Sequence, residues 1–219
     1  MPPVEPPRPF LPELRHAAIG AGVPMWRVTP VEYLDSLFRN ESADVKGDGR
    51  AGGRFDPGPD CPYPYTYVAL DPVTAIAETL LRNRAFTAAG RLLRRDAYAA
   101  RAVSILEPTR PLSLISLVEP EDLAAALQDG WLIHAEPRQY PRTRRWAHWF
   151  RECSDRADGI IWPSKRQPRG RVVLLFGDVD RAGLAMRRAP FGHRALDTED
   201  GEQWLNGLLR PLHTYLKRE

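Results

Sequence analysis

Residues 65–81 of the chain read YTYVALDPVTAIAETLL, a pattern that predicts a strand followed directly by a helix. The first six residues are rich in aromatic and aliphatic side chains, as is typical of a strand. Asp71 and Pro72 then begin the helix, because an Asp N-cap and a Pro at the first helical position both favour initiation. The helix carries one apolar stripe at helical spacing, formed by Val73, Ile76, Ala77, Leu80 and Leu81.

Patterns elsewhere in the chain predict further strands and helices around this unit. Strands are expected at residues 25–28, 102–106, 112–115, 160–162 and 172–176. Helices are expected after Thr29 and Pro30, over residues 119–127 and 144–153, and around Trp204, Leu205, Leu208 and Leu209 before Pro211. Because no internal repeat is present, we predict a single α+β domain with mixed or antiparallel sheets and flanking helices.

Length and composition indicate a globular protein. The 219 residues are 43% hydrophobic and 27% charged, which excludes a disordered chain, and the net charge of +3 excludes a global basic field for coating nucleic acid. Cys61 and Cys153 form no metal-binding pair, and the N-terminal segment lacks a secretory pattern. We therefore expect a cytoplasmic protein without a disulfide or a membrane span, with residues 1–9 as a flexible Pro-rich tail.

The most distinctive loop is GGRFDP at residues 52–57, inside a polar stretch at residues 41–64. Two glycines allow positive φ and let a ligand approach the backbone closely. Arg54 beside them can bind an anion. The same residues are also compatible with an ordinary turn that carries a solvated arginine.

Four other residues become candidates because of where they fall relative to the predicted elements. Arg27 lies in a short apolar strand and needs an anion or carboxylate partner if it is buried. Tyr67 and Glu78 flank the strand–helix junction, so both side chains can reach one cleft. Ser164 follows a strand at a turn, where its hydroxyl can point into the same cleft. Taken singly, each residue is more typical of a core, turn or solvent-facing position.

An arginine-rich stretch, RTRR at residues 142–145, precedes Trp146 and Trp149. Arginines beside aromatic residues can bind nucleic acid through phosphate pairing and base stacking. The helical spacing of the aromatic residues favours a buried face with a solvated basic flank instead. We therefore expect no direct contact with nucleic acid.

Taken in order, these motifs resemble those of the RES domain family. The matching segments are WRV at 26–28, GGRFDP at 52–57, YVALDP at 67–72, AIAETL at 75–80, GIIWPS at 159–164 and the strand at 172–176. The family is named for an Arg, a Glu and a Ser, which match Arg27, Glu78 and Ser164. The resemblance indicates one catalytic domain at residues 10–219, with a core at about 24–177 and a C-terminal helical extension at 178–219.

The resemblance implies a fold similar to that of ADP-ribosyltransferases and an enzyme whose substrate is NAD+. Members of the family consume NAD+ by hydrolysis or phosphorolysis, or transfer ADP-ribose to a protein. They are toxins of bacterial toxin–antitoxin pairs, and their usual antitoxin is an Xre-type helix-turn-helix protein. No metal is required, and a homodimer is compatible with the sequence.

Carried over to this chain, the resemblance assigns catalysis to Glu78, Arg27 and Ser164, and NAD+ binding to Arg27, Arg54, Tyr67 and Ser164. Glu78 would stabilise the cationic ribose that forms when the N-glycosidic bond breaks. The arginines would clamp the phosphates and Tyr67 would stack on the nicotinamide. Ser164 would bond the carboxamide or the ribose.

Three features depart from the family pattern. Asp56 stands where Asn is common, the separation of Glu78 and Ser164 is long, and residues 165–171 are unusually basic. These departures leave the acceptor open among water, phosphate and protein. A mono-ADP-ribosyltransferase is thus the alternative enzyme, and a nucleic-acid-binding or catalytically silent partner-binding protein is the alternative of another class.

Overall fold

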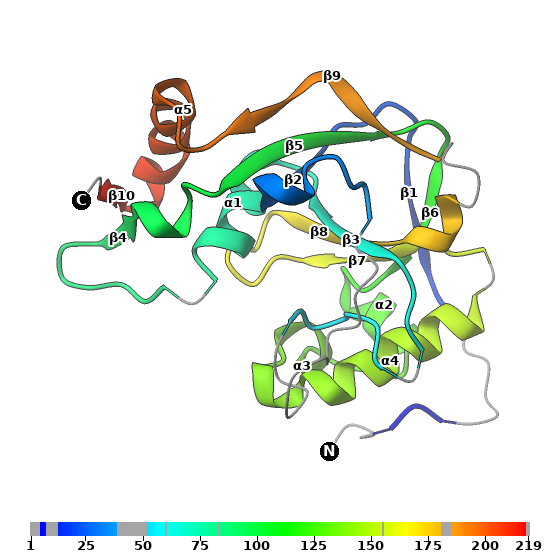
Figure 1. Cartoon of the computed structure of the whole chain (residues 1–219). Helices are drawn as coiled ribbons and strands as arrows, with labels where there is room; N and C mark the ends of the chain where they lie inside the picture. Colours follow the sequence, from blue (N-terminus) through cyan, green and yellow to red (C-terminus); the bar gives the residue numbers. More distant parts are fainter. Residues whose placement is uncertain are drawn as a thin grey trace.

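The computed structural model describes residues 5–7, 13–38, 52–59, 61–82, 84–154, 156–180 and 185–217. Within these ranges, eight strands form one mixed sheet, in which β6 and β7 run parallel and the other neighbours run antiparallel (Figure 1). In spatial order the strands are β1 (His16–Ile19), β6 (Leu112–Ser116), β7 (Gly159–Pro163), β8 (Arg171–Phe176), β3 (Tyr65–Ala69), β2 (Met25–Pro30), β5 (Arg101–Pro108) and β9 (Met186–Ala195).

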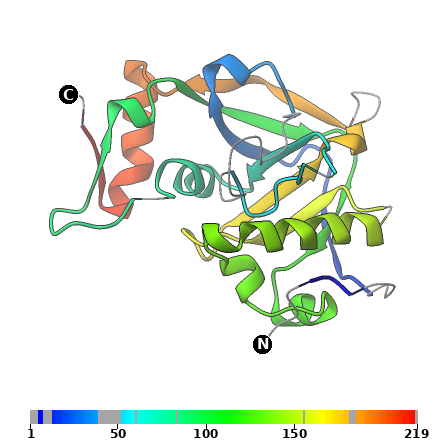
Figure 2. The same cartoon turned by 60° about the horizontal axis from the view of Figure 1, so that its bottom comes forward.

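Helices lie beside this sheet in two groups (Figure 2). One group lies along one side of the sheet and contains α2 (Pro120–Ala125), α3 (Trp131–His134) and α4 (Tyr140–Cys153). The other contains α1 (Pro72–Leu80) and α5 (Glu199–Leu209), next to a small parallel sheet of β4 (Arg91–Arg94) and β10 (Thr214–Lys217). The predicted α+β domain with flanking helices is confirmed.

Apolar side chains from both helix groups pack against the sheet in two core clusters. The predicted aromatic face of α4 is buried through Trp146, Trp149 and Phe150, which belong to one core cluster with Trp162 and Phe176 of the sheet. A second cluster joins α1 and α5 to β5 and β4. These two cores hold α1 and α4 in place, and the loop at residues 52–57 is fastened to α4.

The strand–helix unit at residues 65–81 folds as its sequence predicts. The Asp71 carboxylate accepts a hydrogen bond from the backbone N–H of Thr74 at 2.8 Å, and Pro72 occupies the first helical turn. The stripe packs inward, since Ile76, Ala77 and Leu80 are all buried. Glu78 lies off that buried stripe and is half-buried, so its carboxylate remains available to the cleft described below.

Two predictions about secondary structure are wrong. Thr29 and Pro30 do not begin an α-helix: both residues complete strand β2, and only a single 3-10 turn follows at Val31–Tyr33. The expected C-terminal helical extension at residues 178–219 contains the ten-residue strand β9, which pairs with β5 and completes one edge of the sheet. The apolar residues around 204–209 do form the predicted helix, α5.

Two further expectations fall largely outside the described residues. Of the Pro-rich tail at 1–9, the structure describes only residues 5–7, where the Glu5 carboxylate pairs with Arg145 at 2.6 Å. Of the polar stretch at 41–64, it describes residues 52–59 and 61–64.

Candidate active site

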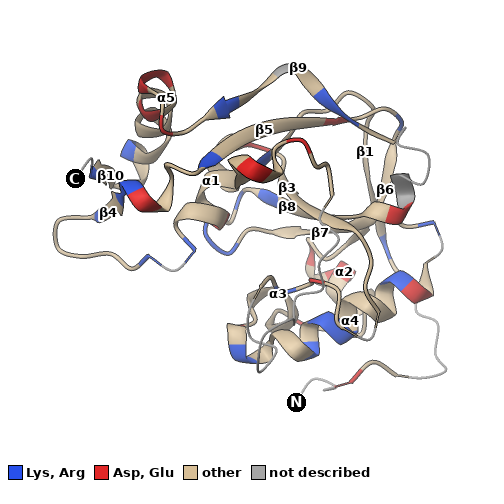
Figure 3. Ribbon diagram, in the orientation of Figure 1, with Lys and Arg blue, Asp and Glu red and all other residues tan. Residues whose placement is uncertain are grey.

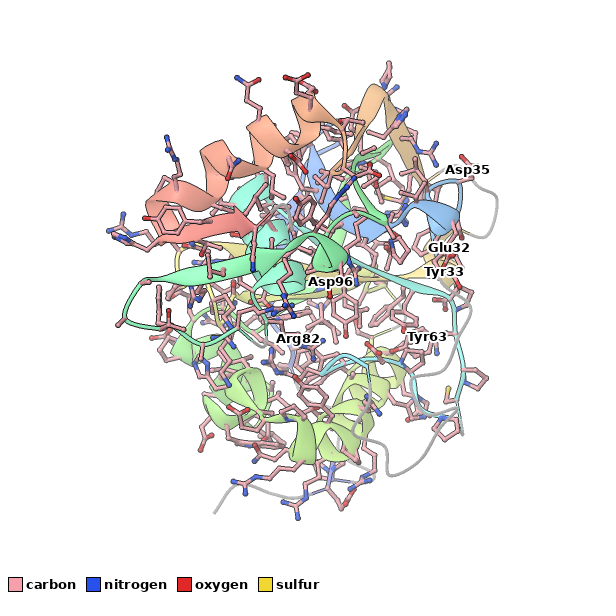
Figure 4. All side chains as sticks on the ribbon, turned by 60° about the vertical axis from the view of Figure 1, so that its left-hand side comes forward. Glu32, Tyr33, Asp35, Tyr63, Arg82 and Asp96 are labelled. Atoms are coloured by element: carbon pink, nitrogen blue, oxygen red, sulfur yellow. The ribbon has the colours of Figure 1, made fainter. Side chains whose placement is uncertain are left out.

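A cleft of about 710 Å³ opens between strands β2 and β3, helix α1 and the loop at residues 52–56. Volumes of roughly 300–1,000 Å³ are typical of small-molecule sites. Its lining includes Tyr33, on the segment after β2, and Arg82, on the segment after α1, both of which are labelled in Figure 4. The cleft thus lies where the predicted strand–helix unit meets the Gly-rich loop.

Four of the five residues predicted from sequence line this cleft: Arg27, Arg54, Tyr67 and Glu78. The sheet brings them together, since β2 and β3 are neighbours and α1 directly follows β3. The fifth residue, Ser164, is only 2% exposed and does not line the cleft. The expectation that its hydroxyl points into the cleft is therefore wrong.

Ser164 instead contacts the carboxylate of Glu78. Its hydroxyl donates a hydrogen bond to Glu78 Oε1 at 2.5 Å. The same Ser164 oxygen accepts hydrogen bonds from the backbone N–H groups of Arg166, at 3.1 Å, and Gln167, at 2.9 Å. The Arg166 N–H also lies 3.3 Å from Glu78 Oε1. The turn after β7 thus holds one oxygen of the carboxylate in place from behind.

The carboxylate of Asp56 organises the Gly-rich loop. It accepts hydrogen bonds from the Gly53 N–H at 2.7 Å, the Tyr67 hydroxyl at 2.7 Å and the Tyr65 hydroxyl at 3.3 Å. Asp56 is 3% exposed, so these donors compensate the burial of its charge. Asp56 thus joins the loop, through the Gly53 N–H, to strand β3, through the two tyrosine hydroxyls.

Gly53 is required by the close approach of this carboxylate. A Cβ at position 53 would lie 2.3 Å from Asp56 Oδ1 and 2.6 Å from the Tyr67 hydroxyl, well inside van der Waals contact. Gly52 has a φ of +81°, in the region that L residues rarely adopt. The two glycines thus let the loop fold tightly against β3 and present Arg54 to the cleft.

Tyr67 fixes the loop and also lines the cleft. Its hydroxyl accepts a hydrogen bond from the Phe55 N–H at 3.1 Å while it donates to Asp56. Burial and the neighbouring Asp56 raise the pKa of Tyr67 well above its usual range, which keeps the phenol protonated as a donor. The ring meets Trp162 edge to face, at 6.0 Å between centroids.

Two buried arginines supply unpaired donors at the cleft. Arg54 Nε and Arg27 Nη2 are buried and have no hydrogen-bond partner in the part of the chain that the structure describes. Burial, followed by the nearby Arg188, lowers the pKa of Arg27 to about 10, so it is still cationic at neutral pH. A buried, unsatisfied charged donor costs at least about 1–3 kcal/mol, which an anionic ligand would recover.

The rest of the Arg27 guanidinium has neutral polar partners, and none of them is the anion or carboxylate that the sequence predicts for a buried arginine. Its Nη1 donates to the carbonyls of Ser36 and Leu37, at 2.7 and 2.9 Å, and its Nε lies 3.3 Å from the Ser104 hydroxyl. Arg27 therefore also fixes the segment after β2 that borders the cleft.

Sequence reasoning missed several residues that build the site. Arg82 and Tyr140 line the cleft, while Thr143 and Arg144 hold the carbonyls of Arg54 and Gly53 from helix α4. The only signal for Arg82 is its position four residues after Glu78, about one helical turn. Tyr140 lies 58 positions from its partner Arg82, and Thr143 and Arg144 lie 89 and 91 positions from theirs, so no local pattern reveals them.

The basic stretch at residues 142–145 does not form one solvated face. Arg144 is buried against the Gly53 carbonyl, and exposed Arg145 pairs with Glu5. Figure 3 shows Lys and Arg on several separate elements, among them β9, α4 and the loop after α1.

The profile of the RES domain matches residues 24–198, most of the chain. The chain belongs to the RES domain family. The match extends past residue 177, where the core was expected to end, and includes strand β9 of the main sheet.

A solved structure with a similar fold is the toxin–antitoxin complex MbcT–MbcA of M. tuberculosis. A chain of that complex is 19% identical to this RES domain protein, with a TM-score of 0.55, over 85% of this chain and 90% of that chain. At that identity the likeness shows the fold alone. No curated protein matches the sequence.

Within the described residues, no group of three or more His, Cys, Asp or Glu side chains is arranged to hold a metal ion. No helix in the same part of the chain is long and apolar enough to cross a membrane.

Proposed function

We propose that this RES domain protein cleaves NAD+ at the bond between nicotinamide and ribose. The observation that carries the proposal is the position of the Glu78 carboxylate, which Ser164 holds at 2.5 Å on the lining of a cleft that also contains Arg27 and Arg54. The Glu78 carboxylate suits a substrate in which one carbon becomes cationic during the reaction. The two buried arginines of the same cleft suit the phosphates of that substrate.

In the proposed reaction, the bonding electrons of the N-glycosidic bond leave with nicotinamide, which becomes neutral. The anomeric carbon of the ribose gains positive charge, and a preorganised carboxylate facing that carbon stabilises the transition state. In hydrolysis, water then bonds to the anomeric carbon and releases a proton to solvent, whereas in phosphorolysis a phosphate oxyanion bonds to the same carbon directly. Glycosidase carboxylates stabilise oxocarbenium-like states by the same physical effect.

The two arginines would bind the pyrophosphate of NAD+. Their unpaired N–H groups, Nε of Arg54 and Nη2 of Arg27, need acceptors, and charge-assisted bonds to phosphate oxygens are among the strong hydrogen bonds of proteins. Because Tyr67 uses its hydroxyl on Asp56 and Phe55, its remaining contribution to substrate is the ring. That ring would pack on the nicotinamide.

The biological role that fits this chemistry is a toxin of a toxin–antitoxin pair. Membership of the RES family and the fold shared with a chain of the MbcT–MbcA complex both support an antitoxin partner. We propose that the partner is an Xre-type helix-turn-helix protein and that the pair acts in the cytoplasm. An acidic or carboxylate-bearing segment would suit a cleft that contains two arginines.

The identity of the products tests the proposal and its alternative. Purified protein is incubated with NAD+, with and without inorganic phosphate, and the products are separated by chromatography and mass spectrometry. Free ADP-ribose indicates hydrolysis, a phosphorylated ADP-ribose that forms only with phosphate indicates phosphorolysis, and a protein-linked ADP-ribose indicates a mono-ADP-ribosyltransferase. Absence of all three products would favour a catalytically silent partner-binding protein or a nucleic-acid-binding protein. A gel shift that weakens with salt would identify the nucleic-acid-binding protein.

A further inference from the structure

The carbonyls of three consecutive loop residues each accept a hydrogen bond from a side chain outside the loop. Arg82 Nη2 donates to the Gly52 carbonyl at 3.0 Å, and Arg144 Nη2 donates to the Gly53 carbonyl at 3.2 Å. The Thr143 hydroxyl donates to the Arg54 carbonyl at 2.5 Å. The backbone that carries the Arg54 side chain is thus fixed residue by residue.

Among these three donors, Arg82 alone comes from the segment that carries Glu78. Arg144 and Thr143 belong to helix α4, whereas Arg82 follows the end of α1 by two residues. Among the described residues, Arg82 therefore links the segment that carries Glu78 to a carbonyl of the Gly-rich loop by a hydrogen bond.

The same Arg82 nitrogen also ties this link to α4. Nη2 donates to the Tyr140 hydroxyl at 2.7 Å, and the guanidinium lies 5.4 Å from the centre of the Tyr140 ring. Tyr140 is the first residue of α4 and is 5% exposed. Arg166 in turn donates to the Arg82 carbonyl from the turn that holds Ser164. One arginine thus joins α1, the Gly-rich loop, α4 and the turn after β7.

We propose that Arg82 is a positioning residue, which with Tyr140 sets the separation between the Glu78 carboxylate and the Arg54 guanidinium. This inference rests on the proposed cleavage of NAD+, in which the first group faces the ribose and the second binds phosphate. A substrate that spans both groups reacts only when they are correctly spaced, and a misplacement of about 1 Å can cost roughly 100-fold in rate.

The test is a set of variants assayed for NAD+ cleavage, with kcat and KM measured separately and Tm recorded. Arg82→Met keeps the length of the side chain and removes its donors, Arg82→Lys keeps a charged donor, and Tyr140→Phe keeps the ring and removes the acceptor. Arg94→Gln, on the exposed side of β4, is the matched control.

We expect Arg82→Met to lower kcat by about 10- to 100-fold with KM changed by less than about 3-fold, because the phosphate-binding arginine is still present. Arg82→Lys should stay closer to wild type. The Arg82→Met/Tyr140→Phe double variant should lose no more activity than the worse single variant, since the two residues act as one unit. Arg94→Gln should match wild type.

Several outcomes would overturn the inference. An unchanged kcat in Arg82→Met excludes positioning, and a raised KM with an unchanged kcat makes Arg82 a substrate-binding group instead. If Arg82→Met and Arg82→Lys both lose activity in proportion to a fall in Tm, the role of Arg82 is structural. If Arg82→Met does not fold, an unchanged kcat in Tyr140→Phe overturns the inference. If the wild-type protein leaves NAD+ intact, the proposed function is overturned together with this inference. The other outcomes overturn only the positioning role of Arg82.

Discussion

The hydroxyl of Ser164 donates its hydrogen bond to the carboxylate of Glu78 and lies behind that carboxylate, outside the lining of the cleft. Two backbone N–H groups, of Arg166 and Gln167, point at the Ser164 oxygen and leave its proton directed at Glu78. Of the three residues that give the family its name, Ser164 therefore contacts Glu78, and in the proposed reaction it would act on the substrate through that carboxylate.

This relationship predicts the effect of Ser164→Ala. Without the hydroxyl, the carboxylate loses its strongest anchor, and we expect kcat for NAD+ cleavage to fall by about 10-fold with little change in KM. Ser154→Ala, on the surface near His16, should match wild type in the same steady-state assay. A rise in KM without a loss of kcat would indicate that Ser164 binds substrate directly.

Arg54 is expected to act mainly on binding. Arg54→Ala removes a buried cation with an unpaired Nε, and loss of a charge-assisted bond of about 1.5–3 kcal/mol corresponds to a KM roughly 10- to 100-fold higher. Isothermal titration with a non-cleavable NAD+ analogue should show the same loss of affinity. Normal affinity with a collapsed kcat would place Arg54 in the chemical step.

The loop geometry predicts a contrast between two glycines. Gly53→Ala places a methyl group 2.3 Å from Asp56 Oδ1 and should lower both Tm and activity, because the loop must shift to accommodate it. Gly58→Ala adds a methyl with nothing within 4 Å and should leave both unchanged. Thermal unfolding and NAD+ cleavage of the two variants check this, and equal behaviour would show that the Gly53–Asp56 contact does not control the site.

In a bacterial cell, expression of the wild-type protein without an antitoxin is expected to deplete NAD+ and stop growth, because an active enzyme would destroy a central cofactor. Glu78→Gln should do neither at the same expression level. Co-expression of the proposed antitoxin should restore growth. Normal NAD+ and growth with well-folded wild-type protein would contradict the toxin role.

The sequence predicts the local parts of this molecule well and its long-range contacts poorly. The strand–helix unit at 65–81 forms as expected because its capping, proline position and apolar stripe are all local properties. Strand β9 was missed because residues 186–195 form a strand only by pairing with β5, some 80–90 positions away. Thr29 carries a helix-start signal, yet pairing of β2 with β5 outweighs it.

The residues of the site likewise divide into those that local motifs predict and those that depend on contacts between distant segments. The Gly-rich loop, Arg27, Tyr67 and Glu78 could be named from motif order, and all contribute to one cleft. The direction of the Ser164 hydroxyl and the roles of Thr143, Arg144 and Tyr140 could not be predicted. They depend on how α4 packs against the loop and on how the turn after β7 contacts Glu78, which no spacing within the sequence encodes.

The most direct test of the central claim is release of nicotinamide from NAD+ by purified wild-type protein and by Glu78→Gln, which keeps the size of the side chain and removes its charge. We predict nicotinamide release by the wild type and a rate at least about 100-fold lower in the variant, as for the loss of one preorganised electrostatic group. Equal rates for the two folded proteins, or no release by the wild type, would contradict the account.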